Sequence, residues 1–138
     1  MKYEKHYYEG QSTGLQYYEI PNNLKPLVLL HAQAVDSSSF FNVMPELSRH
    51  FHVYAVDCYG HGGSLHEAEK YNVTDMGNAI IDFIQNVVKE PVCLLGHSSG
   101  GLIAAYTAAR GDLCSGLVLE GADVARHLGG AKLVAVFA

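Results

Sequence analysis

Apolar residues along the chain fall into four short runs, none of which alternates with polar positions. Such continuous runs are typical of strands that are buried on both faces of a parallel sheet. They occupy residues 27–30, 53–56, 92–95 and 116–119. Ahead of them, residues 6–9 and 15–20 alternate between polar and apolar positions around a loop at residues 10–14. The pattern therefore predicts an antiparallel hairpin followed by four buried strands.

Three segments between these runs carry helical periodicity. Thr74 is predicted to cap an amphipathic surface helix that continues to residue 89. Residues 99–110 are apolar almost all round, which predicts a helix packed tightly against the sheet. Residues 38–50 carry an inward stripe of apolar side chains, but Pro45 interrupts it and predicts a kink. The alternation of strands and helices indicates the α/β class with a mostly parallel sheet.

Composition narrows the possible functions. The chain has 138 residues, which suits one domain, and 49% of them are hydrophobic, enough to build a core. Its 9 basic and 14 acidic residues give a net charge of -5, so it lacks the basic surface that nucleic-acid binding needs. It has neither an apolar signal region nor a stretch approaching the ~20 apolar residues of a membrane span. We therefore expect a cytoplasmic protein with neither nucleic-acid nor membrane partners.

Cofactor motifs are missing from the sequence. The nearest match to the dinucleotide-binding pattern Gly-x-Gly-x-x-Gly, residues 60–65, ends in leucine, and there is no Gly-Lys-Ser or Gly-Lys-Thr phosphate-binding loop. Three cysteines, Cys58, Cys93 and Cys114, lie in or beside apolar runs without the spacing of metal ligands, so we expect reduced core residues. No organic cofactor and no metal is expected.

One motif carries chemistry. Gly96-His97-Ser98-Ser99-Gly100 directly follows the third buried run and opens the buried helix. A serine on such a sharp strand-to-helix turn, with glycine two residues before and two after it, is typical of a nucleophile elbow. The free N–H groups and the positive dipole end of the helix point toward Ser98, which favours developing oxyanion charge. This context favours an elbow over a plain strand-to-helix turn.

Two further motifs are similar to those of a known protein family. His31-Ala32-Gln33 ends the first buried run where members of the α/β-hydrolase family usually carry His-Gly, and residues 57–64 are similar to the family's Asp-x-x-Gly-His-Gly-x-Ser turn. From about residue 7 to residue 122, the chain resembles the first six strands and three helices of this family. The resemblance implies that residues 1–122 are the N-terminal part of such a domain, incomplete at the C-terminus, and that residues 123–138 form an atypical hydrophobic tail.

The resemblance also implies roles for individual residues. Ser98 would be the nucleophile, and the backbone N–H groups of Gln33 and Ser99 would form the oxyanion hole. Ala32 departs from the family's glycine, and its Cβ is expected to shift the Gln33 amide if this position needs an open φ. The serine argues against the dehalogenase and epoxide-hydrolase branches, which resemble this chain but use aspartate as the nucleophile.

The remaining members of a catalytic triad are not evident. The family delivers an acid and then a histidine from strands that follow the nucleophile. Asp123 and His127 stand in this order, but they are four residues apart, whereas one βαβ unit alone takes ~30 residues. We therefore expect the histidine from outside residues 1–138, with Ser98-Asp123-His127 as an alternative.

Other polar residues near these motifs have structural interpretations. His97 is expected to pack with its side chain pointing away from the nucleophile. Asp57, His61 and His66 form a conceivable metal site, but a structural turn whose polar side chains hold loop backbone is favoured. His31 is expected to brace a loop through hydrogen bonds.

The favoured function is hydrolysis of a carboxylic ester or similar small acyl substrate through a Ser98 acyl-enzyme. Carbon–carbon hydrolases, lyases and perhydrolases share the same elbow and are alternatives within the family. A truncated, catalytically inactive fragment or interaction module, which lacks the triad acid and histidine, is an alternative from a different class. Self-association is expected through the exposed edge at residues 116–120 or through residues 132–138.

Overall fold

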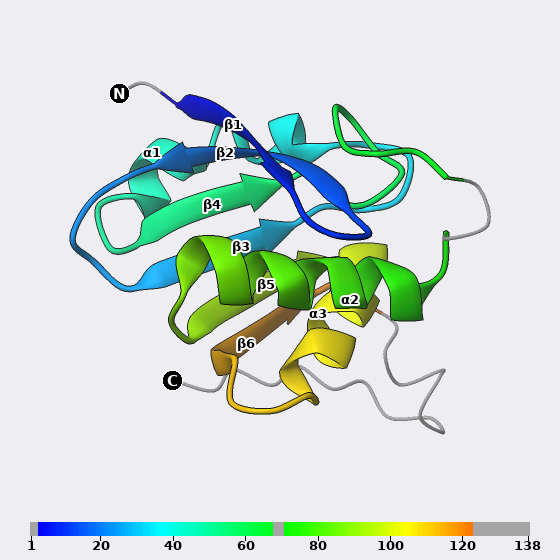
Figure 1. Ribbon diagram of the computed structural model, residues 1–138. Helices are drawn as coiled ribbons and strands as arrows, with labels where there is room; N and C mark the ends of the chain where they lie inside the picture. Colours follow the sequence, from blue (N-terminus) through cyan, green and yellow to red (C-terminus); the bar gives the residue numbers. More distant parts are fainter. Residues whose placement is uncertain (1–2, 68–70, 123–138) are drawn as a thin grey trace.

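A computed structural model describes residues 3–67 and 71–122 of the chain (Figure 1). Within these residues, one mixed sheet has the strand order β1-β2-β4-β3-β5-β6. Its strands are β1 (Glu4–Glu9), β2 (Gly14–Ile20), β3 (Pro26–Leu30), β4 (His52–Val56), β5 (Val92–His97) and β6 (Cys114–Glu120). The predicted hairpin and all four buried runs are confirmed.

Strand direction divides the sheet into two parts. β1 pairs with β2, and β2 with β4, in antiparallel fashion, whereas β4, β3, β5 and β6 lie parallel to one another. The predicted α/β class, with a mostly parallel sheet and an N-terminal antiparallel hairpin, is therefore confirmed. Because parallel strands end at the same edge of the sheet, the loops after β3, β4 and β5 meet there.

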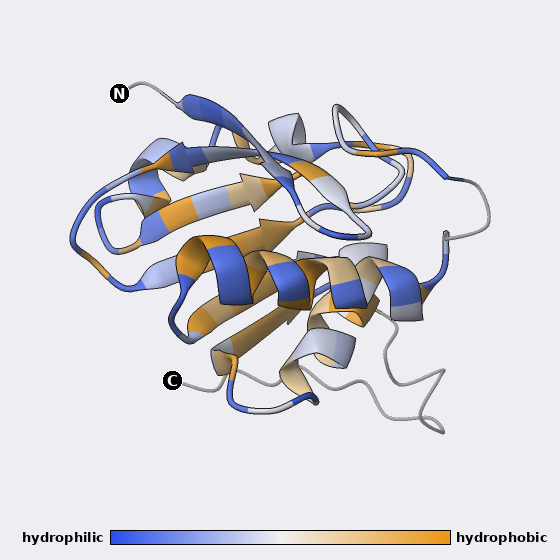
Figure 2. Cartoon of the chain, in the orientation of Figure 1, coloured by the Kyte–Doolittle hydropathy of each residue, from blue (hydrophilic) through white to orange (hydrophobic). Residues whose placement is uncertain are grey.

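Helices cover both faces of the sheet (Figure 1). α2 (Val73–Phe83), which continues as the π-helix η3 (Ile84–Val88), and α3 (Ser99–Ala108) pack on one face. The short elements η1 (Ser37–Phe40) and α1 (Met44–Leu47) pack on the other. Polar and apolar residues alternate along α2, as expected of an amphipathic surface helix (Figure 2). None of the helices in the described part of the chain is long and apolar enough to cross a membrane.

The cap of α2 differs from the prediction. Asn72, not Thr74, precedes the helix in an extended conformation, and its side-chain oxygen accepts a hydrogen bond from the N–H of Asp75 at 2.8 Å. Thr74 lies inside the first turn. Asparagine and threonine both serve as N-caps, so residue type alone did not distinguish the two positions.

The kinked helix predicted over residues 38–50 is wrong, because two short helices occupy this segment. Asp36 caps η1 by accepting a hydrogen bond from the N–H of Ser38 at 2.9 Å. Pro45 lies in the first turn of α1. A proline is well accommodated there because the N–H that it lacks would have no partner inside the helix. Pro45 therefore begins a helix instead of kinking one.

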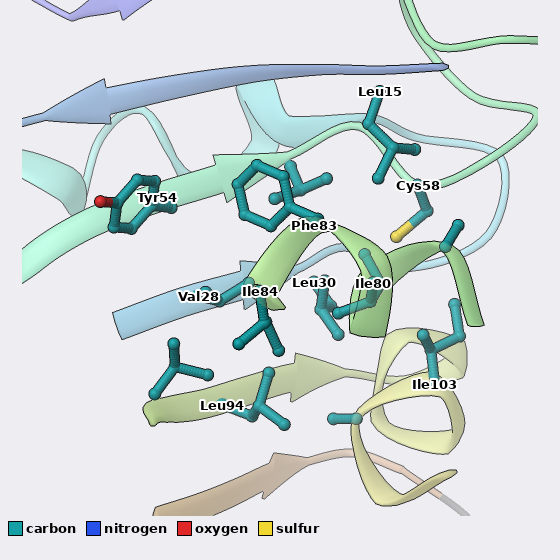
Figure 3. Close-up of a cluster of buried hydrophobic side chains, with 14 of the residues drawn as sticks. Leu15, Val28, Leu30, Tyr54, Cys58, Ile80, Phe83, Ile84, Leu94 and Ile103 are labelled. Atoms are coloured by element: carbon teal, nitrogen blue, oxygen red, sulfur yellow. The ribbon is translucent and has the colours of Figure 1, made fainter. Parts of the chain in front are cut away.

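The larger hydrophobic core lies between the sheet and α2 with α3. Close-packed side chains from the two layers point toward one another there, among them Val28, Leu30 and Leu94 of the sheet and Ile80, Phe83 and Ile84 of the helical layer (Figure 3). Burying each such side chain contributes about 1.5–3 kcal/mol relative to leaving it exposed. A smaller core on the opposite face includes Leu29, Met44 and Ala55. Together the cores hold the strand ends, and hence the loops beyond them, in place.

The three cysteines are free thiols. Cys58 is fully buried, and its burial raises the pKa of its thiol to about 12, so the thiol stays protonated. Cys93 and Cys114 are only partly buried. Of the three cysteines predicted to be core residues, only Cys58 is fully buried.

Candidate active site

A tight turn joins β5 to α3 and carries Ser98. This serine has a φ of 54° and a ψ of -120°, a region that residues with a Cβ rarely adopt and that stores about 1–3 kcal/mol of strain. Its N–H donates to the carbonyl of Glu120 at 2.8 Å, and its own carbonyl accepts from the N–H of Gly101 at 2.9 Å. The Ser98 side chain is exposed and makes no capping hydrogen bond. The hydroxyl is therefore presented to solvent at the N-terminus of α3.

Crowding of the backbone explains the two glycines of the motif. A Cβ on Gly96 would lie 2.4 Å from the carbonyl oxygen of Gly100, and one on Gly100 would lie 2.2 Å from the carbonyl oxygen of Leu30. Both distances are far inside van der Waals contact, and backbone atoms cannot rotate away as a side chain can. Glycine is required here by close approach of chain segments, since neither residue has a positive φ.

The loop after β3 reaches this turn. The N–H of Gln33 donates to the Ser99 hydroxyl oxygen at 2.6 Å, so the two residues predicted for an oxyanion hole are brought together. The chain turns by way of Ala34, whose φ is 67°. The φ of Ala32 is not positive, so alanine does not strain the backbone at this position. The shift of the Gln33 amide that was expected if this position needed an open φ therefore has no basis in the backbone of Ala32. The contact between Gln33 and the Ser99 side chain was not predicted from the sequence.

His31 braces the same loop, as predicted. Its Nδ1 lies 2.7 Å from the carbonyl oxygen of Ala32, which can only accept, so Nδ1 carries the proton. Its Nε2 accepts a hydrogen bond from the N–H of Cys58 at 2.9 Å. Burial lowers the pKa of the His31 imidazole below its ordinary value, which favours this neutral form. His31 thus ties the loop after β3 to the loop after β4.

The stretch after β4 is a structural turn centred on Asp57. This buried carboxylate accepts hydrogen bonds from the N–H and hydroxyl of Ser37, the N–H of Gly63 and the side-chain amide of Gln16, at 2.5 to 3.0 Å. His61 and His66, the other members of the conceivable metal site, place ring nitrogens 3.2 Å from backbone carbonyls of Tyr59 and Gly62, respectively. The geometry therefore agrees with the favoured interpretation of a turn that holds loop backbone.

A mostly apolar cavity of about 510 Å³ opens beside these loops. Its lining includes His31, Gln33 and Ser99, together with Tyr71, Met76 and Ile103. Ser98 is not among its lining residues, although Ser99 is. A larger polar cleft of about 740 Å³ lies between the hairpin loop and α2, but it contains no residue of the elbow. The smaller cavity is the one adjacent to the candidate nucleophile.

Within the described residues, no general base lies at Ser98. His97 Nδ1 lies 3.5 Å from a carboxylate oxygen of Glu120, at the ends of β5 and β6. Across residues 3–67 and 71–122, the Ser98 hydroxyl has no hydrogen-bonded side chain. Asp123 and His127 lie outside the described residues.

The chain is similar in sequence to known proteins. A sequence model of the alpha/beta hydrolase family matches residues 27–138. The (E)-2-((N-methylformamido)methylene)succinate hydrolase of Acinetobacter baylyi is 32% identical over 105 residues, which are 75% of this chain and 40% of that protein. The pimeloyl-(acyl-carrier protein) methyl ester esterase of Neisseria meningitidis is 33% identical over 91 residues, which are 66% of this chain and 34% of that protein.

Solved structures show the same architecture. A membrane phospholipase A matches with a TM-score of 0.80 and 26% identity, covering 85% of this chain and 39% of that chain. This chain therefore spans less than half the length of the relatives that it resembles. The family match over residues 27–138 includes β4, β5, β6 and Ser98.

Proposed function

Because the chain belongs to the alpha/beta hydrolase family, we propose that it carries the nucleophile and oxyanion hole of a serine hydrolase that acts on a carboxylic ester or similar small acyl substrate. The observation that carries this proposal is the strained backbone of Ser98, held between two glycines at the N-terminus of α3. A fold does not tolerate such strain without compensation, and strained residues cluster at active sites. The names of the two curated relatives, a hydrolase and an esterase, support the same class of reaction.

The chemistry would proceed in two steps. The Ser98 hydroxyl loses its proton to a general base as its oxygen bonds to the carbonyl carbon, and the carbonyl oxygen becomes an oxyanion. Collapse of this intermediate breaks the bond to the alcohol, which leaves with a proton, and an acyl-enzyme forms. Water then attacks the acyl-enzyme in the same way and releases the acid. The base is proposed to be a histidine from outside the described residues, either His127 or one beyond residues 1–138.

Two backbone N–H groups would stabilise the oxyanion. The Ser99 N–H is one of the first N–H groups of α3, which have no partner inside the helix. The Gln33 N–H already donates to the Ser99 hydroxyl, so an incoming oxyanion would have to displace that hydroxyl. A preorganised donor of this kind is worth about 10²–10³ in rate.

The apolar cavity beside the hole is the proposed binding place for the acyl group. Its lining includes the apolar side chains of Met76 and Ile103 as well as Gln33 and Ser99. An apolar acyl chain would bury its surface there while its carbonyl carbon lies toward Ser98.

A non-catalytic interaction module is the second candidate. It is favoured by the lack of a hydrogen-bonded base at Ser98 within residues 3–67 and 71–122. A serine at its free pKa is a poor nucleophile, so an elbow without a base would be inactive.

Covalent labelling by a fluorophosphonate, followed by intact-mass measurement, tests the proposal and separates the two candidates. One adduct per chain is expected, and Ser98→Ala should abolish it. Ser12→Ala, which removes an exposed serine away from the elbow, is the matched control and should label like the unaltered chain. Chain that is folded by circular dichroism but takes no label would contradict an activated Ser98 with His127 as its base within residues 1–138, and would support the interaction module.

A further inference from the structure

A second cluster of reactive side chains lies at the antiparallel end of the sheet, on the face covered by α2. Glu4 and His6 of β1 and Glu19 of β2 each place one ligand atom within 4.8 Å of the others. Tyr8, which follows on the same face of β1, donates a hydrogen bond to Asp82 of α2 at 2.9 Å and thereby identifies that face. The cluster is remote from Ser98, because it lies where β4 begins and not where the parallel strands end (Figure 1).

Strand register brings these side chains together. Glu4 is directly opposite Glu19, and His6 is directly opposite Tyr17 in the antiparallel pair. Two carboxylates placed directly opposite each other repel and destabilise the pairing. His6 Nε2 lies between them, 3.4 Å from a Glu4 oxygen and 3.1 Å from Oε1 of Glu19. A cation at this place would convert the repulsion into attraction.

The two distances from His6 Nε2 to the carboxylates fit a small divalent cation. In a tetrahedral zinc site with ligand bonds of about 2.0–2.2 Å, neighbouring ligand atoms lie about 3.3 Å apart. The two distances from His6 Nε2 bracket that value. An imidazole nitrogen among the ligands favours zinc over magnesium, which prefers oxygen ligands and near-octahedral geometry.

His52 supports the cluster from the neighbouring strand. Its Nε2 lies 2.7 Å from Oε2 of Glu19, the carboxylate oxygen that His6 does not use. Its ring stacks on Tyr54, with centroids 4.4 Å apart and planes 16° apart. The Glu19 side chain is 15% exposed, against 53% for Glu4. Glu19 is therefore anchored and oriented, as outer partners orient the carboxylates of metal sites.

We propose that Glu4, His6 and Glu19 bind a zinc ion, with His52 as a positioning residue and water in the fourth place. β1 is an edge strand that pairs only with β2 in the described sheet. The ion would join β1 to β2, and the Glu19–His52 contact would extend that link to β4. The site would secure the open edge of the sheet independently of any reaction at Ser98.

Calorimetric titration of the full chain with zinc chloride at pH 7.5, after removal of bound metal with a chelator, tests this proposal. We expect one zinc ion per chain, binding weakened at least tenfold by His6→Ala, and binding weakened about 10- to 100-fold by His52→Ala. His50→Ala, which removes an exposed histidine outside the cluster, should bind like the unaltered chain. Magnesium chloride should bind far more weakly than zinc.

Thermal unfolding supplies a second readout, because a ligand that binds only the folded chain raises the unfolding temperature. Zinc should raise it in the unaltered chain and in His50→Ala, and not in His6→Ala. Equal zinc affinity in the unaltered chain and a folded His6→Ala variant, or no zinc binding to either, would overturn the proposal.

Discussion

Two turns meet at the candidate active site, and they are held by different physical means. The turn after β5 is shaped by backbone crowding, with glycine at the two positions where a Cβ would strike a carbonyl. The turn after β3 contains no glycine, although Ala34 has a positive φ. Hydrogen bonds to side chains hold it instead, from the N–H of Gln33 to Ser99 and from the N–H of Cys58 to His31.

This difference predicts how well each turn tolerates a substitution. A backbone contact leaves no freedom to adjust, so a single added carbon should disrupt the turn after β5. A hydrogen bond to a side chain is worth only about 0.5–1.5 kcal/mol net, so the turn after β3 should survive the loss of one. Three substitutions test this contrast.

Gly100→Ala should have the largest effect. Its Cβ would lie 2.2 Å from the Leu30 carbonyl oxygen and 2.5 Å from that of His31, so β3 and α3 must separate. We expect a loss of about 3 kcal/mol or more in the free energy of unfolding, measured by urea denaturation. Gly111→Ala is the control, because Gly111 has a φ of 73° and an added Cβ would meet no atom within 4 Å, and it should lose only about 1 kcal/mol. Equal losses would show that crowding is not what requires glycine at the elbow.

His31 should make the free energy of unfolding depend on pH. This effect should lie between those of Gly100→Ala and Ser99→Ala. Its folded pKa is lowered by burial, whereas the unfolded chain takes up a proton near pH 6.5. Below about pH 6.5 the unfolded state therefore binds more protons, and the free energy of unfolding falls as pH falls, by at most about 1.4 kcal/mol per pH unit from this group. His31→Gln should reduce the slope measured by urea denaturation between pH 7 and pH 5.

The control for this measurement is His50→Gln, which alters an exposed histidine and should keep the slope of the unaltered chain. A His31→Gln slope equal to that of His50→Gln would mean that His31 titrates alike in the folded and unfolded chain.

Ser99→Ala should have the smallest effect, and it should increase reactivity. Removing the hydroxyl frees the Gln33 N–H, so the rate of fluorophosphonate labelling at Ser98 should rise by about 2- to 10-fold, the value of one hydrogen bond. Ser12→Ala again serves as the control. Slower labelling would contradict the proposal that the oxyanion displaces the Ser99 hydroxyl from the Gln33 N–H. It would indicate that the Ser99 hydroxyl itself donates to the oxyanion.

The secondary structure was largely predictable because it depends on neighbours in the chain. Continuous apolar runs predicted the four parallel strands, and alternation predicted the hairpin. The predictions that were wrong concern boundaries. Asn72 and Thr74 are both suitable caps for α2, and Pro45 is compatible either with a kink or with a first turn.

The candidate site was predictable only in part. Ser98, Gly96 and Gly100 belong to one pentapeptide between a buried run and a helical segment, and this local context indicated an elbow. The contact of Gln33 with the Ser99 hydroxyl joins residues 66 positions apart and left no signal in the local pattern. The cluster of Glu4, His6 and Glu19 was missed for the same reason, since only register in the sheet unites it.

The sequence by itself determined the class of the fold, the order of its elements and the position of Ser98, because these follow from periodicity and from steric limits within a few residues. Tertiary structure alone decided which loops face one another. The strand order β1-β2-β4-β3-β5-β6 differs from the chain order, and it places the end of β3 beside the end of β5. That placement, stabilised by buried cores on both faces of the sheet, brings the N–H of Gln33 to the Ser99 hydroxyl.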